Sequence, residues 1–240
     1  MKCKLKKEND SNYLHLGRVV FYGRTLYEYE QMFGLDTSMY TQCKILDCPA
    51  GPSSFVAEAS KLGINVVGCD PLFGKPLKEL IDRAGTDIKL VLSRISSVPH
   101  LYNWDIYTSI EGLRRFREMA LQIFESDYCT GLLERRYIMG ELPKLPFKDN
   151  SFDLALSGNL LFYYNDEFDY SFHRDSIVEF LRISKEARIY PIQGPYEHPW
   201  KYIDKLLLDL KKEAIAAKSV PVPHDFQRGV NKMLVITSRK

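Results

Sequence analysis

The run Ile45 to Ser54 is the part of the sequence best suited to chemistry, because an acid, a turn of small residues and a pair of serines follow one another there. Asp47 ends an apolar run typical of a buried strand, and Pro49 and Gly51 break that run. A helix is expected to begin near Ser53. Such a turn brings backbone N–H groups and the positive end of a helix dipole close to an anionic ligand group. The same residues also suit an ordinary strand-to-helix turn, since short glycine motifs are weakly specific.

A second acid, Asp70, follows the next apolar run, Ile64 to Cys69. A carboxylate at the carboxyl end of that strand can accept hydrogen bonds from both hydroxyls of a ribose, which is how nucleotide-type cofactors are held. The alternative is a turn residue before Pro71. Ligands of open α/β sheets bind beyond the carboxyl ends of the strands, so Asp70 and the turn after Asp47 are expected to face one crevice.

A third element is the run Gly140 to Phe147, followed by Asp149 to Asp153. It places an acid, Glu141, after the third predicted strand and a turn before the fourth. Alone it could be a tight loop. Together with the first two elements it favours a ligand site at one edge of a sheet.

Alternating strands and helices are expected to position these residues. The pattern predicts strands at 43–47, 64–69, 137–139, 152–157, 188–192 and 233–237. Helices are predicted at 53–63, 77–85, 109–124, 176–183 and 200–217, with one or two more within 13–40. This order predicts an α/β fold, a doubly wound and mostly parallel sheet covered on both faces.

Two segments are predicted to form a helical cap over this sheet. Residues 1–42 form an aromatic-rich N-terminal cap, and residues 43–240 form the α/β domain with a cap insertion at about 86–134, which is longer than a normal connection. A cap of this kind would shape an acceptor pocket with Tyr22, Tyr102, Trp104 and Tyr107 as walls. The alternative is a peripheral packing layer.

The three chemical elements resemble the class I S-adenosylmethionine-dependent methyltransferases. The resemblance is to the small-molecule-modifying branch and covers about residues 43–240. It implies a Rossmann-like methyltransferase fold with an antiparallel last strand at 233–238. It also implies S-adenosyl-L-methionine as the cofactor and methyl transfer to a small-molecule acceptor as the activity.

The resemblance assigns cofactor contacts residue by residue. The turn after Asp47 would hold the methionine end of the cofactor; Gly51 keeps the middle glycine of the family's motif, and Pro49 and Ser53 stand where the first and third are expected. Pro49 lacks the backbone donor of the residue it replaces. The remaining assignments are Asp70 with Pro71 for the ribose, Glu141 and Leu142 for the adenine, and Ser157, Gly158 and Asn159 where cofactor and substrate meet.

A general base is required only if the acceptor must lose a proton. The candidates near the predicted crevice are Tyr163, Tyr164, His173 and His198, each of which also has a purely structural interpretation. No Asn/Asp-Pro-Pro-Tyr run follows the fourth strand. That run is typical of the amino-methylating nucleic-acid enzymes, so its absence disfavours a base amine as acceptor.

Composition and charge indicate which classes of partner to expect. Lys and Arg number 33 against 31 Asp and Glu, a net charge of +2, without the basic stripe typical of nucleic-acid binding. Nucleic acid is therefore not an expected partner.

The longest run without charged residues, 154–165, is too short to cross a membrane, which takes roughly 20 apolar residues. The five cysteines form no CxxC pair, so we expect reduced thiols, no metal and a cytoplasmic protein.

Two other functions remain open at this level. One is a nucleic-acid or protein methyltransferase with the same cofactor, and the other is a non-catalytic binding module that retains the fold. A nicotinamide dehydrogenase is disfavoured, because the turn supplies one glycine in place of G-x-G-x-x-G and Asp47 would repel a pyrophosphate. The sequence leaves the acceptor's identity and the oligomeric state open.

Overall fold

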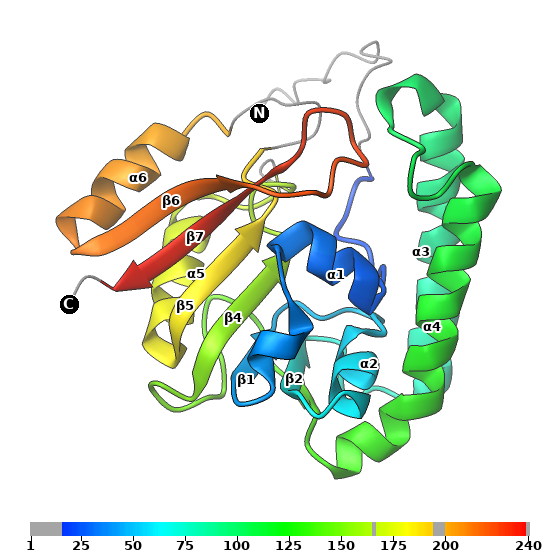
Figure 1. Cartoon of the computed structure of the whole chain (residues 1–240), viewed down its shortest axis with the longest axis horizontal. Helices are drawn as coiled ribbons and strands as arrows, with labels where there is room; N and C mark the ends of the chain where they lie inside the picture. The colour runs from blue at the N-terminus through cyan, green and yellow to red at the C-terminus, as the bar shows by residue number, and fades with distance from the viewer. Residues whose placement is uncertain (1–15, 165–166, 194–199, 239–240) are drawn as a thin grey trace, which may run out of the picture.

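A computed structural model describes residues 16–164, 167–193 and 200–238. Seven strands form one sheet in these residues: β1 Lys44–Asp47, β2 Asn65–Asp70, β3 Tyr137–Met139, β4 Phe152–Gly158, β5 Ser184–Tyr190, β6 Ile215–Pro221 and β7 Lys232–Ser238. Their order is β3-β2-β1-β4-β5-β7-β6 (Figure 1). Strand β7 is antiparallel to both of its neighbours, and the other pairs are parallel. The predicted fold class, a mostly parallel methyltransferase-type sheet with an antiparallel last strand, is confirmed.

Helices cover both faces of the sheet and one of its edges. They are α1 Leu26–Phe33, α2 Phe55–Lys61, α3 Leu77–Ser97, α4 Ile110–Leu133, α5 Tyr170–Ile183 and α6 Ile203–Lys212, with short 3₁₀ turns η1 Thr37–Tyr40 and η2 Pro99–Leu101. In Figure 1, α1 and α2 lie on the near face, α5 lies behind the sheet, and α3 and α4 stand side by side on the right, beyond α2. No helix of the described residues is both long and apolar enough to cross a membrane.

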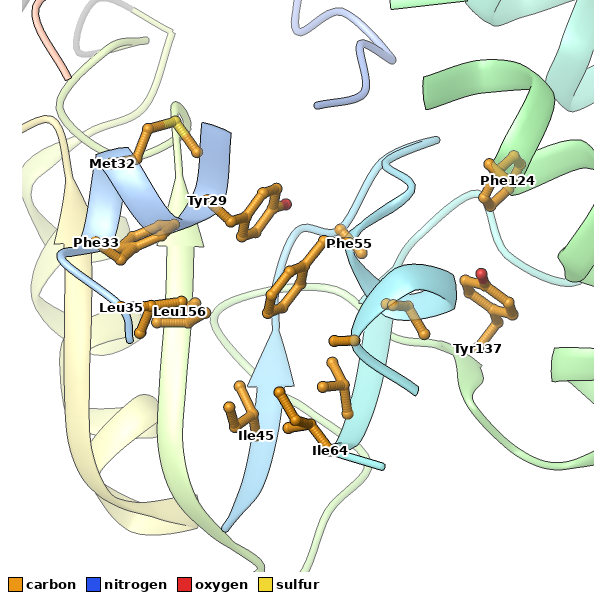
Figure 2. Close-up of a cluster of buried hydrophobic side chains, with 14 of the residues drawn as sticks. Tyr29, Met32, Phe33, Leu35, Ile45, Phe55, Ile64, Phe124, Tyr137 and Leu156 are labelled. Atoms are coloured by element: carbon orange, nitrogen blue, oxygen red, sulfur yellow. The ribbon is translucent and has the colours of Figure 1, made fainter. Parts of the chain in front are cut away.

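Alternation along the strands divides the buried residues between two faces. In β1, Ile45 packs with the core under α1 and α2, whereas its neighbour Leu46 packs with the core under α5 and α6. Figure 2 shows the first of these cores, in which Ile45 and Leu156 of the sheet face Tyr29 and Phe55 of the helices. A third cluster joins α3, α4 and residues 16–22. The sheet is thus fixed on both faces, and the helical hairpin α3–α4 has a core of its own.

Helix α1 is held at its N-terminus by a buried ionic cluster. Thr25 and Glu28 form a capping box, in which each side chain accepts a hydrogen bond from the other residue's backbone N–H. The fully buried carboxylate of Glu28 also pairs with Arg117 of α4 and accepts a hydrogen bond from Tyr107. Arg117 donates in addition to the carbonyl of Gly23. One cluster therefore links the start of α1 to the helical hairpin.

The helical hairpin is longer than the sequence pattern predicts. The prediction that a helix closes near Gly85 is wrong: α3 continues to Ser97, and α4 runs on from Ile110 to Leu133. A Cβ at Gly85 would meet no atom within 4 Å, so this glycine lies on the open side of the helix. Glycine costs a helix only about 1 kcal/mol, and burial of the opposite face outweighs that cost.

The C-terminal third also differs from prediction. The helix predicted over 200–217 ends at Lys212, and Ile215–Pro221 is the strand β6 instead. Its pairing with β7 over its whole length decides this, and the sequence pattern of the segment alone does not reveal that pairing. Helix α5 begins earlier than predicted, at Tyr170 after the capping Asp169, and β5 spans Ser184–Tyr190 in place of 188–192.

We expect Glu28→Gln to lower the free energy of unfolding by about 3–5 kcal/mol, because it leaves the guanidinium of Arg117 buried without a counter-charge. Urea denaturation at pH 7 measures this. Glu79→Gln, at an exposed ion pair of α3, is the control and should change stability by less than about 1 kcal/mol. A Glu28→Gln/Arg117→Met double variant should be more stable than Glu28→Gln alone; a less stable double variant would contradict the role of the pair.

Burial by itself raises the pKa of Glu28, but the charges of Arg117 and Arg24 lower it to about 2. Since this folded-state pKa is below the ordinary 4.5, the ionised carboxylate stabilises the fold above pH 4.5. That contribution should be lost as the pH falls from about 4.5 towards 2, and Glu28→Gln should lack this part of the acid dependence.

Candidate functional site

A cavity of about 420 Å³ lies at the carboxyl ends of β1, β2, β4 and β5. One side is formed by the segments that follow these strands: 48–51, 70–72, 158–160 and 190–191. The other side is formed by residues from 16–24, the helical hairpin and the loop between β6 and β7. Both the location and the size are typical of small-molecule sites in α/β folds.

The turn after β1 is clamped onto the end of β2. The N–H of Ala50 donates to the carbonyl of Cys69 at 3.0 Å, and the N–H of Gly51 donates to Oδ2 of Asp70 at 3.0 Å. The N–H of Ser54 donates to the carbonyl of Arg24. These three donors are therefore paired within the protein and do not reach an anionic ligand group. Gly51 lies at φ 57, which favours glycine.

Asp70 lies at the cavity with only 4% of its surface exposed. Oδ2 accepts from Gly51, and Oδ1 accepts from the N–H of Leu72 at 2.9 Å. Burial raises the pKa of Asp70 to about 6, against the lowering effect of these two hydrogen bonds. A carboxylate oxygen has two lone pairs, so each oxygen retains an acceptor site for a further donor.

Asp47 lies beneath the cavity rather than in its wall. It is fully buried and does not line the cavity, which corrects the expectation of a direct contact. The hydroxyl of Tyr29 donates to it, 2.9 Å from Oδ2, and Tyr29 itself lines the cavity. Burial, opposed by this hydrogen bond, raises the pKa of Asp47 well above its usual range. The strand-end acid Asp47 thus lies close to the cavity, but Tyr29 of α1 covers Asp47.

Most of the other predicted cofactor residues come together around the cavity. Pro49, Gly51, Ser53, Pro71, Glu141, Leu142, Gly158 and Asn159 all line it. Ser157 does not: its side chain is buried, and its hydroxyl has no hydrogen-bond partner among the described residues. Of the predicted aromatic walls, Tyr22, Tyr102 and Tyr107 line the cavity, whereas Trp104 packs behind Tyr102 and Phe226.

The catalytic candidates separate into three groups. Tyr163 and Tyr164 line the cavity, and burial raises the pKa of Tyr164 to about 12. His173 is fully buried away from it, stacked 4.1 Å from Trp200, with its ring nitrogens 2.7 Å from the carbonyl of Asp169 and 2.8 Å from that of Leu161. Its interpretation as a catalytic residue is therefore wrong, because both nitrogens are engaged in packing α5. His198 lies outside the described residues.

The structure adds a histidine that sequence reasoning missed. His224, in the loop between β6 and β7, lines the cavity with Nδ1 2.8 Å from the hydroxyl of Tyr190. That hydroxyl donates to the carbonyl of Val230 at 2.7 Å, so it accepts from Nδ1–H of His224. Nε2 then carries a lone pair and has no hydrogen-bond partner among the described residues. Burial, with the charge of Arg24, lowers the pKa of His224 to about 3, so the ring is neutral.

Comparison with known proteins gives one relative and several similar folds. No protein-family model matches the chain. The chain is 32% identical over 225 residues to the uncharacterized protein MJ0045 of Methanocaldococcus jannaschii, an alignment that covers 93% of this chain and 98% of that protein. The chain belongs to the family of this archaeal protein.

Among solved structures, three methyltransferases illustrate the similarity. The TehB-like enzyme of Corynebacterium glutamicum is 16% identical, with 82% of this chain and 80% of that chain covered and a TM-score of 0.41. The 1,6-didemethyltoxoflavin-N1-methyltransferase of Burkholderia thailandensis, crystallised with 1,6-didemethyltoxoflavin and S-adenosylhomocysteine, is 13% identical, with 85% and 76% covered and a TM-score of 0.42. An S-adenosylmethionine-dependent methyltransferase of Aquifex aeolicus is 13% identical, with 88% and 92% covered and a TM-score of 0.40.

The raised pKa of Asp70 predicts how the stability of the fold changes with pH. A carboxyl whose folded-state pKa is about 6 and whose unfolded pKa is about 3.9 destabilises the fold as it ionises. Stability relative to Asp70→Asn should therefore fall by about 2 kcal/mol as the pH rises from 4 to 7. Chemical denaturation of both proteins across this range measures the difference. A constant difference would show that Asp70 does not titrate in this window.

Proposed function

We propose that this protein transfers the methyl group of S-adenosyl-L-methionine to a small-molecule acceptor. The observation that carries the proposal is the carboxylate of Asp70, which lines the cavity beside Gly51 at the end of β2. An acid in this position suits the two hydroxyls of a ribose. The methyltransferase-type sheet is consistent with this cofactor.

The residues around the cavity fit the cofactor. Each oxygen of Asp70 has an acceptor site left for a ribose hydroxyl. Glu141 and Leu142, which follow β3, would meet the adenine. Gly51 and Asn159, which follow β1 and β4, would flank the methionine end. Because Gly51 has no Cβ, a ligand can approach its backbone closely, and the same lack of a Cβ permits its positive φ.

When bound, the cofactor supplies an activated methyl group on its sulfonium. The chain's own residues then have to orient the acceptor and exclude water. Tyr102 and Tyr107 are 2% exposed and suit this role as walls of the cavity. The neutral ring of His224 offers Nε2 as a hydrogen-bond acceptor and can orient an N–H or O–H of the acceptor.

The covered walls of the cavity favour a small acceptor over a macromolecule. Aromatic side chains from the helical hairpin and from the β6–β7 loop pack on one another there, Phe226 lying 4.8 Å from Tyr102 and 4.6 Å from Tyr107 between ring centroids. A nucleic acid or a protein substrate would require an open path across this face. We therefore propose a small molecule as the acceptor. We also propose that the protein works in the cytoplasm, which suits its free cysteines.

Calorimetry with S-adenosylmethionine and its demethylated product, S-adenosylhomocysteine, tests the proposal directly. We expect both to bind the wild-type protein, with affinity weakened by about one to two decades in Asp70→Asn, since hydrogen bonds to a charged group contribute about 1.5–3 kcal/mol. Because the pKa of Asp70 is about 6, wild-type binding should be about tenfold weaker at pH 5 than at pH 8. Absence of binding by the wild type would refute the proposed cofactor.

Gly51 provides a second test, with a matched control in the same chain. Gly51 and Gly34 both lie at φ 57, and a Cβ would meet ordinary contacts at Gly51 and no atom within 4 Å at Gly34. Valine at either position should strain the backbone similarly and lower the melting temperature by a few degrees per kcal/mol. Only Gly51→Val should abolish S-adenosylmethionine binding. Normal binding by a folded Gly51→Val would place the cofactor elsewhere.

A further inference from the structure

Arg24 carries a positive charge into the cavity from a fixed piece of backbone. Its N–H donates to Oγ of Ser53 at 3.1 Å, and its carbonyl accepts from the N–H of Ser54 at 3.0 Å. The side chain is half-buried and lines the cavity, with the guanidinium 5.6 Å from the ring centroid of Tyr22. The start of the side chain is therefore held against the β1–α2 turn, and its charged end lies beside Tyr22 in the wall of the cavity.

Arg24 differs from the other arginines of the cavity wall. Arg83 pairs with Asp87, and Arg117 pairs with Glu28. Within 16–164, 167–193 and 200–238, no ion pair and no side-chain hydrogen bond engages the guanidinium of Arg24. Its charge affects Glu28, but Arg117 already matches the single negative charge there. An unmatched guanidinium in a partly buried, mostly apolar site is costly unless an anion joins it.

The neighbours that experience this charge identify the half of the cavity in which it lies. Burial raises the pKa of Tyr164 and Tyr190, and the charge of Arg24 partly opposes that rise. Burial lowers the pKa of His224, and Arg24 lowers it further. For Asp70 the causes are burial and two backbone hydrogen bonds, without a contribution from Arg24. The charge of Arg24 also lowers the pKa of Tyr22, Tyr29 and Tyr107 against the effect of their burial. Arg24 thus lies between α1, the helical hairpin and the β6–β7 loop, and its charge does not act on the ribose-binding acid of the proposed function.

The wall around this half is aromatic. Tyr22, which lies against the guanidinium, and Tyr107, whose pKa the charge of Arg24 lowers, both line the cavity. Tyr107 forms one packed group with Tyr102 and Phe226, which also line the cavity. Flat rings pack well on such surfaces. A single guanidinium matches the charge and the fork geometry of one carboxylate, whereas a doubly charged phosphate would call for further cations.

We propose that the methyl acceptor is an aromatic carboxylate, with its carboxylate paired to Arg24 and its ring packed among these aromatic side chains. This inference rests on the proposed function, because it assigns the remaining half of the cavity to the cofactor. Arg24 is then a specificity-determining residue: it recognises the charge of the acceptor and does not take part in methyl transfer itself.

The test uses three pairs of probes that differ only in charge: 2-naphthoate and 2-naphthamide, indole-3-acetate and indole-3-acetamide, 4-hydroxybenzoate and 4-hydroxybenzamide. Each is titrated by calorimetry into the full-length protein saturated with S-adenosylhomocysteine. We expect at least one carboxylate to bind ten times more tightly than its amide. Arg24→Gln should abolish that preference and change S-adenosylhomocysteine affinity less than twofold. Arg83→Gln, at another arginine of the same wall, is the control and should keep the preference.

Two results would overturn the proposal. One is equal affinity of the wild type for carboxylate and amide in every pair, or no binding of any carboxylate. The other is that Arg24→Gln weakens S-adenosylhomocysteine tenfold or more and leaves 5′-methylthioadenosine, which lacks the amino-acid end, unaffected. Arg24 would then hold the carboxylate of the cofactor. Titration of the probes without S-adenosylhomocysteine separates this test from the proposed function: a carboxylate preference in a wild type that binds no cofactor would support the anion site and refute the cofactor.

Discussion

The buried pair of Glu28 and Arg117 holds the two halves of the molecule in register. Glu28 belongs to α1, which packs on the sheet, and Arg117 belongs to α4 of the helical hairpin. The same carboxylate caps its own helix and accepts from Tyr107, so moving the hairpin would disrupt the helix start, the ion pair and one wall of the cavity together. Separating a buried ion pair is costly, because each charge is then left buried without a counter-charge.

The cavity lies between the two parts of the molecule that this ion pair joins, the sheet and the helical hairpin. The sheet contributes the strand-end turns, and the hairpin with residues 16–24 contributes the opposite wall. The β6–β7 loop completes the enclosure: Asn103 donates to the carbonyl of Phe226, and Arg228 donates to that of Leu101. Backbone hydrogen bonds of this kind fix a loop that would otherwise be a poor wall for a binding site.

Asp70 and Asp47 illustrate how neighbouring strand-end acids take different roles. Both are buried, but Asp70 faces the cavity and Asp47 is covered by Tyr29. Burying ionisable carboxyls costs free energy unless donors compensate, and their raised pKa values reflect that cost. Asp70 thus accepts hydrogen bonds from Gly51 and Leu72 and still has acceptor sites free for a ligand. Keeping such a buried carboxyl at a binding site lowers the stability of the fold, which is a common trade-off between stability and function.

The sequence by itself indicated the mostly parallel α/β class, six of the seven strands and the strand-end turns, because period and turn residues are local signals. A parallel α/β fold brings such turns together at one ligand edge. These signals placed Asp70 and Gly51 at that edge, and the family resemblance pointed to Glu141 and Asn159; all four line the cavity. It did not determine the end of α3, the strand β6 or the positions of Tyr29, Arg24 and His224 at the cavity. Those depend on partners remote in the chain: β6 is a strand because β7 pairs with it, and His173 is structural because Leu161 and Trp200 surround it. Whether an arginine is paired or an imidazole nitrogen is left without a partner is a property of three-dimensional neighbours, which spacing along a chain does not carry.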